Sequence, residues 1–164
     1  MPQTAVQTLL FLTDNAFENS RPHSLLSNLG TVTAADYDRE HDGRSIREMV
    51  RHLAAAKYVY NNFAFEDASM TWPTMQDRLF ATDKTMADDL EWLRHGQQVL
   101  RASLAALDDA GLLTQRPVHM GGTLETRNIL SIMIEHDLYH AGEINHLRAL
   151  MQGTDYWRGR EPKT

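Results

Sequence analysis

The sequence contains no cysteine among its 164 residues. Disulfides, thiolate metal ligands and a cysteine nucleophile are therefore excluded, and any bound metal must be held by nitrogen and oxygen donors. The sequence also lacks an apolar run near the ~20 residues of a membrane span, and its opening residues lack the basic start of a signal peptide. These absences predict a cytoplasmic protein with no membrane partner.

Positive charge is in the minority, with 16 lysines and arginines against 22 acidic residues and a formal net charge of −6. A nucleic-acid-binding protein normally presents an excess of basic residues on at least one face, because much of its affinity comes from the phosphates. The only basic concentration here is a short tail containing Arg158, Arg160 and Lys163. We therefore expect no nucleic-acid partner.

Apolar residues recur at helical spacing in four long segments, with no repeat, low-complexity stretch or strand-like alternation between them. Ser45 with Glu48, and Thr85 with Asp88, have the spacing of capping boxes, and Gly153 suits a helix end. The first predicted helix starts at residue 5 and ends near residues 20–22, with a short helical piece at 23–29. The other predicted helices are 45–65, 85–111 and 123–153, with connections at 31–44 and 67–84. The pattern predicts one all-α domain over residues 1–164, a helix bundle.

Three histidines lie in or beside these apolar stripes. His136 and His140 occupy the middle of the last helix, and His52 lies in an apolar row of the second. Residues four apart on a helix are neighbours, so His136 and His140 can converge on one metal ion. Buried imidazole nitrogens must be satisfied, either by a metal or by hydrogen bonds to carbonyls or to Asp137 and Glu143. Spacing and face alone leave both interpretations open.

Two separated motifs resemble signatures of the DinB-like superfamily. The segment 136–148, HDLYHAGEINHLR, resembles the signature of its last helix, and the segment 45–53, SIREMVRHL, resembles that of its second helix. The stretch 23–29, HSLLSNL, is similar to the end of the first helix in one branch. The resemblance follows nearly the whole chain in the same order.

This resemblance implies a four-helix bundle with up-down-down-up connectivity, and frequently a homodimer. It also implies one divalent metal ion, zinc first and nickel second, bound by His52, His136 and His140. Three histidines leave a coordination position for water or substrate, as in catalytic zinc sites. The superfamily includes metal-dependent transferases and isomerases that use low-molecular-weight thiols. A small-molecule substrate and such a thiol are therefore expected if the chain is an enzyme; the alternative is a non-catalytic metal-binding protein, stress-associated or acting through interactions.

Apolar residues outside the main stripes, Leu10, Phe17 and Trp92, also suggest a second buried face and a homodimer. Gln97 interrupts a leucine row and could bond a metal-bound water, or lie where the bundle opens to solvent. Glu143 could orient His140 or act as a fourth ligand, or make only an exposed contact.

The remaining polar residues are interpreted as surface or packing groups. His146 lies on the flank of the last helix, away from its apolar stripe. The residues expected to be exposed are His41, His95, His119, Arg47, Glu48, Arg51, Asp88, Asp89 and Glu91, and those expected mainly to pack are Tyr58 and Tyr139.

Overall fold

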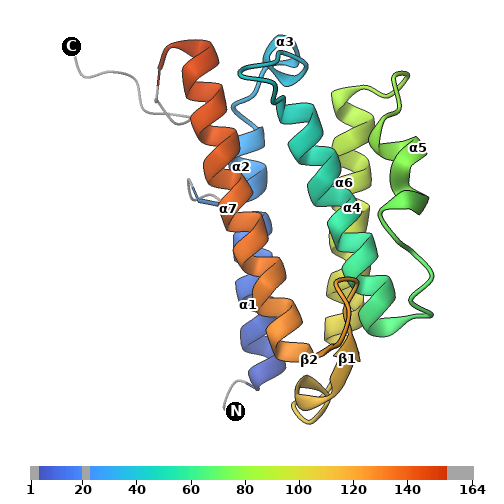
Figure 1. The fold of residues 1–164 in the computed structure, drawn as a ribbon. Helices are drawn as coiled ribbons and strands as arrows, with labels where there is room; N and C mark the ends of the chain where they lie inside the picture. The colour runs from blue at the N-terminus through green and yellow to red at the C-terminus, as the bar shows by residue number, and fades with distance from the viewer. Residues whose placement is uncertain (1–3, 20–22, 155–164) are drawn as a thin grey trace.

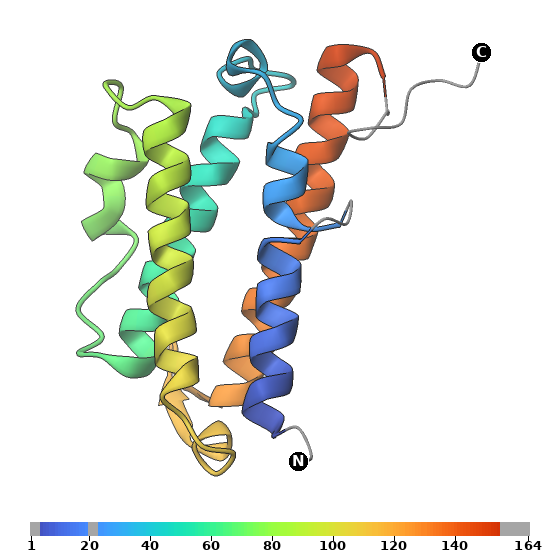
Figure 2. The ribbon, with the colours of Figure 1, turned by 180° about the vertical axis from the view of Figure 1, so that it is seen from behind.

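The computed structural model describes residues 4–19 and 23–154 of the chain. The protein is mostly helical, and its four long helices are α1 (Ala5–Phe17), α4 (Ile46–Phe65), α6 (Met86–Ala105) and α7 (Thr126–Gln152). These helices lie side by side (Figure 1), and the short helix α2 (Leu25–Leu29) follows α1 end to end (Figure 2). The predicted end of the first helix near residues 20–22 and the basic tail at 158–163 lie outside the described residues.

The helix starts predicted at Ser45 and Thr85 are confirmed. Ser45 Oγ accepts a hydrogen bond from the Glu48 amide while Glu48 accepts one from the Ser45 amide, and Thr85 and Asp88 form the same reciprocal pair. These bonds satisfy amide groups that the first turn of a helix leaves without partners. At the other end of the chain, Gly153 follows α7 with a φ of 67°, a left-handed conformation that glycine adopts without strain.

The predicted boundaries around residue 115 are wrong, because a small hairpin lies there. β1 (Gln115–Pro117) pairs antiparallel with β2 (Thr123–Glu125), so the last helix begins at Thr126 and not at Thr123. The preceding helix ends at Ala105, short of Gly111. Gly121 and Gly122 have φ values of 91° and 80° and form the turn between the strands.

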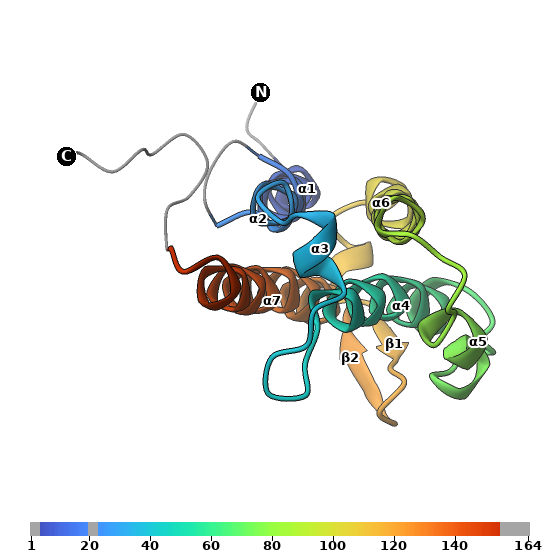
Figure 3. The ribbon, with the colours of Figure 1, turned by 90° about the horizontal axis from the view of Figure 1, so that it is seen from above.

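The two connections also contain short elements that the sequence analysis did not predict. Residues 31–44 include α3 (Ala34–Tyr37), and residues 67–84 include a 3₁₀ turn (Pro73–Met75) and α5 (Gln76–Leu79); a second 3₁₀ turn, Gly111–Leu113, precedes the hairpin. Viewed from above, α5 lies outside α4 and α6, while α1 and α7 occupy the other side of the molecule (Figure 3). The connection containing α5 therefore covers α4, the helix that carries His52.

The buried apolar residues form two core clusters. The first cluster includes Leu53, Leu93 and Ile144, and the second includes Tyr60, Leu100 and Met133. Along α1, α6 and α7, the residues between the clusters include three buried polar side chains, Thr13, Gln97 and Asp137. The core is thus interrupted halfway along the helices by a polar layer. Two of the predicted metal ligands, His136 and His140, lie at the same level of α7.

Within residues 4–19 and 23–154, no helix combines the length and the apolar character needed to cross a bilayer.

Candidate metal site

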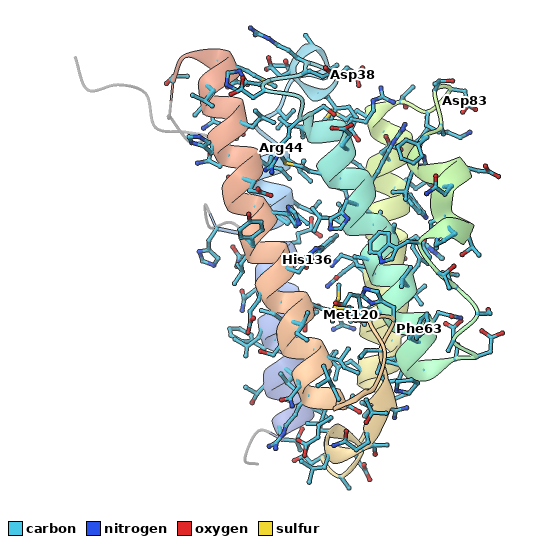
Figure 4. All side chains as sticks on the ribbon, in the orientation of Figure 1. Asp38, Arg44, Phe63, Asp83, Met120 and His136 are labelled. Carbon is cyan, nitrogen blue, oxygen red and sulfur yellow. The ribbon has the colours of Figure 1, made fainter. Side chains whose placement is uncertain are left out.

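The structure brings together the three histidines that the sequence analysis selected. His52 projects from α4, and His136 and His140 project from α7. The ring centroids lie 5.0 Å apart for His52 and His136, 5.2 Å for His52 and His140, and 4.6 Å for His136 and His140. Figure 4 shows His136 pointing from α7 toward α4. Among the described residues, these are the three ligand-type side chains found close enough together to hold one metal ion.

The distances fit a divalent ion. One nitrogen from each histidine lies within 4.8 Å of the other two. The Nε2 atoms of His52 and His136 are 3.0 Å apart, and two nitrogens bound tetrahedrally to one zinc ion, each about 2.05 Å from it, lie about 3.3 Å apart. In the metal-free chain, 3.0 Å is also a hydrogen-bond distance. For His52 and His136, only a small displacement therefore separates this geometry from that of two metal ligands.

Hydrogen bonds within the protein do not account for all the buried imidazole nitrogens. Nδ1 of His136 is buried without a hydrogen-bond partner. The carboxylate of the neighbouring Asp137 is bound to Lys57 instead, with Nζ 2.8 Å from both oxygens. Nδ1 of His140 lies 2.7 Å from Oε2 of Glu143, an ion-pair distance for a protonated ring, but no hydrogen bond of good geometry joins them. The hydrogen-bonded alternative is therefore only partly realised.

An aromatic residue from the connection between α4 and α6 covers His52. The Trp72 indole stacks on the His52 ring with centroids 5.1 Å apart and an interplanar angle of 8°.

Burial lowers the pKa of His52, and the nearby His140 lowers it further. Burial and the neighbouring histidines and Lys57 lower the pKa of His136 to about 3. Both rings are therefore neutral near pH 7, the form that binds metal.

The lowered pKa values predict that the metal-free protein loses stability on acidification. Histidine in the unfolded chain has a pKa near 6.5, so below that pH the unfolded state binds protons that His52 and His136 in the folded state do not. The free energy of unfolding can fall by at most about 1.4 kcal/mol per histidine for each pH unit. The actual fall is smaller because the two rings are partly solvated. Urea unfolding at pH 7.5 and 5.5 measures the loss, and His136→Gln should make it smaller. An equal loss in that variant would contradict the assignment.

A cavity of about 310 Å³ adjoins the histidines on one side. Its lining comes from the start of α4, the loop before it and the middle of α7: Arg44, Ser45, Glu48, Met49, His52, Tyr139, His140 and Glu143. The volume is at the lower end of the range for small-molecule pockets. Two of the three candidate ligands thus face a space in which a small molecule could reach a bound ion.

Glu143 connects the cavity wall to His140. Its Oε1 accepts hydrogen bonds from the Tyr139 hydroxyl and from Arg44, both at 3.1 Å, while its Oε2 faces His140. Glu143 does not belong to the close group of ligand atoms formed by the three histidines. It is therefore placed to orient His140, the first of the roles considered from the sequence.

The other histidines differ in how well the sequence indicated their positions. His146 and His41 are exposed, as predicted. His95 is also exposed but its Nδ1 lies 2.6 Å from the Tyr58 hydroxyl. His119 was predicted to be exposed to solvent, but it is half-buried in the turn of the hairpin, among the rings of Tyr60, Phe63 and Trp72. Its apolar partners come from distant segments, so no local pattern pointed to this burial.

Gln97 and the pair formed by Arg51 and Asp89 are polar groups in the interior of the protein. Gln97 is buried, and neither amide atom has a hydrogen-bond partner. No described contact joins Gln97 to a candidate ligand. Arg51 and Asp89, predicted to be solvated, are buried and paired at 2.8 Å.

The fold and the site define a helical protein with a three-histidine group that could hold a metal ion. The chain belongs to the DinB superfamily, whose family model matches residues 16–144. The resemblance stated from the two helix motifs is thereby confirmed. Comparison with curated proteins found no match.

Proposed function

We propose that this protein binds one divalent metal ion through His52, His136 and His140. The convergence of the three rings from α4 and α7 supports this, together with the 3.0 Å separation of Nε2 of His52 and Nε2 of His136. Zinc is the first candidate and nickel the second, because neutral imidazole binds both.

We further propose that the protein with its bound ion uses a low-molecular-weight thiol. Its sulfur would bond to a carbon of a small electrophilic substrate while the thiol proton and the substrate's leaving group go to solvent, or it would add to the substrate and leave again, isomerising it. The observation that carries this proposal is the cavity of about 310 Å³ beside His52 and His140. A divalent ion at this site would lower the pKa of a thiol bound to it. His52 and His140 would present the ion to the cavity, Glu143 would hold the orientation of His140, and Met49 and Tyr139 would contact the thiol or the substrate.

The thiol reaction is tested with the zinc-loaded and nickel-loaded protein. We expect an arylating electrophile to be consumed faster with bacillithiol, mycothiol or glutathione when the loaded protein is present, and chelation to remove the difference. The His146→Ala variant, changed at an exposed histidine of the same helix, should keep the full rate.

The competing function is non-catalytic metal binding in a stress-associated or interaction protein. It is favoured because both carboxylates in the cavity wall already have hydrogen-bond partners and neither is placed as a catalytic acid or base. Glu48 caps α4, and Glu143 is bonded to Arg44 and Tyr139. Metal uptake without acceleration by any of the three thiols would reject the enzyme and leave this second function.

We also propose that residues 1–164 form one four-helix bundle with up-down-down-up connectivity. The ribbon supports this arrangement, since α1 and α7 run upward in Figure 1 while α4 and α6 run downward. The family match over residues 16–144 supports a single domain.

A homodimer remains our proposal, but the residues first named for its interface are not available. Phe17 is buried in the first core cluster, Leu10 packs partly buried against the second, and Trp92 is covered by Tyr58 and Arg78. Phe11 and Leu12 of α1 are instead exposed, at 60% and 43%. Adjacent exposed apolar residues mark a possible interface.

Light scattering at high micromolar concentration should therefore give a dimer mass, and Phe11→Ser/Leu12→Ser should shift the mass toward the monomer. Phe80→Ser, changed at an exposed residue of another segment, is the control. A strictly monomeric wild-type protein would contradict the proposal.

A further inference from the structure

A buried ion pair joins the two helices that carry the three histidines. Lys57 of α4 is 0% exposed and Asp137 of α7 is 2% exposed. Lys57 Nζ donates to both carboxylate oxygens of Asp137 at 2.8 Å, and it lies 5.0 Å from the centroid of the Phe17 ring on α1. The pair belongs to the polar layer between the two core clusters.

The position of this pair relates it directly to the site. Asp137 follows His136 immediately and precedes His140 by three residues, and Lys57 is five residues after His52. The other buried polar side chains of this layer, Gln97 of α6 and Thr13 of α1, belong to neither of these two helices, and their buried side-chain polar atoms have no hydrogen-bond partner. Among the described contacts, side-chain hydrogen bonds join α4 to α7 at this ion pair and between the rings of His52 and His136 themselves.

Stability alone does not explain such a pair. Removing two charges from water is costly, and replacing a buried ion pair with apolar residues of similar volume often leaves a protein as stable or makes it more stable. Two apolar side chains pack over a range of separations, whereas an ammonium nitrogen held 2.8 Å from both oxygens of one carboxylate defines the distance between the two helices at that point. A metal site built from two helices needs a defined distance between them, because metal–ligand distances vary by only about 0.2 Å.

We propose that Lys57 and Asp137 are positioning residues that set the separation and rotation of α4 and α7 at which His52 meets His136 and His140. This inference rests on the proposed metal site. The pair contributes to metal binding through the geometry of the helices, and neither residue touches the ion.

The test uses the double variant Lys57→Met/Asp137→Leu, which replaces the pair with apolar side chains of similar length and branching, and Co²⁺ as the probe. We expect the variant to fold and to resist urea at least as well as the wild type, but to bind Co²⁺ about 10- to 100-fold more weakly, the effect typical of disturbing groups behind metal ligands. The visible absorption of bound Co²⁺ should also change, because it reports the ligand geometry. A role in stability alone would move neither quantity in a folded variant.

Two further variants complete the design. Lys57→Arg keeps a cation that can pair with Asp137, so it should bind Co²⁺ more tightly than Lys57→Met/Asp137→Leu, but less tightly than the wild type because the larger, planar guanidinium must fit a fully buried position. Arg101→Met/Asp14→Leu makes the same kind of double change in a pair that links α6 to α1, helices without candidate ligands, and should bind Co²⁺ normally.

The outcomes separate this inference from the proposed function. If the wild-type chain does not bind Co²⁺, the metal site is rejected and the positioning role with it. If the wild type binds Co²⁺, and the folded Lys57→Met/Asp137→Leu variant binds it with the same affinity and spectrum, the metal site stands and the positioning role is overturned.

Discussion

Replacing His136 and His140 with alanine should abolish stoichiometric metal binding. The wild-type chain is expected to take up about one divalent ion, as open three-histidine zinc sites do. The double variant retains only His52, so its affinity should fall by well over the roughly 100-fold that disturbing a group behind the ligands costs. Elemental analysis after chelation and reloading, together with metal titration, measures both quantities.

The matched control is His41→Ala/His146→Ala, which removes two exposed histidines and should bind metal as the wild type does. The single variant His52→Ala should weaken binding while leaving the pair on α7 able to chelate weakly. Full-strength binding by His136→Ala/His140→Ala would reject the assigned ligands. Unchanged binding by His52→Ala, beside a loss in His146→Ala, would show that the third ligand is wrong.

Replacing Asp89 with alanine should lower the free energy of unfolding by about 3–5 kcal/mol, the cost of leaving a buried charge without its partner. Asp89 is fully buried and accepts three hydrogen bonds: from the Tyr37 hydroxyl at 3.0 Å, from Arg51 Nε at 2.8 Å and from Arg78 at 2.7 Å. Burial raises the pKa of Tyr37, and the Asp89 carboxylate beside it raises that pKa further. Without Asp89, the buried Arg51 guanidinium and the Tyr37 hydroxyl both lose a partner.

Urea unfolding of the metal-free protein measures this effect. Glu91→Ala is the control, because Glu91 is an exposed acidic residue of the same helix and its removal should change the free energy of unfolding by no more than about 0.5 kcal/mol. Tyr37→Phe should cost less than Asp89→Ala, since it removes one of the three bonds and leaves the ion pairs with Arg51 and Arg78. Equal effects of Asp89→Ala and Glu91→Ala would contradict the buried network.

The helices were predictable because their signals are local. A capping box such as Ser45 with Glu48 satisfies amides within one turn, so three residues of spacing reveal it. The end of α6 was predicted wrongly from the same kind of local spacing. Leu107 continues the apolar row of α6 and packs against the second core cluster, but the helix has already ended at Ala105. Apolar periodicity reports which residues face the core, and not where the backbone leaves the helix.

The candidate ligands were predictable for the same reason. His136 and His140 are four residues apart on one helix, and their shared face follows from helix geometry alone. The inclusion of His52 came from the resemblance to the DinB-like signature of the second helix, since no spacing rule connects residues 84 positions apart. The structure then brought His52 within 3.0 Å of His136.

The helical character of this protein, the main helix starts and the histidines that share a face can be predicted from the sequence, because they depend on contacts within a few residues. The pairing of Lys57 with Asp137, the burial of Asp89 with Arg51 and the stacking of Trp72 on His52 depend instead on how distant segments pack. A charged side chain on a helix has the same local pattern whether it faces water or a partner on another helix. The partner and the burial are set by how distant segments pack, and that packing gives the site its geometry.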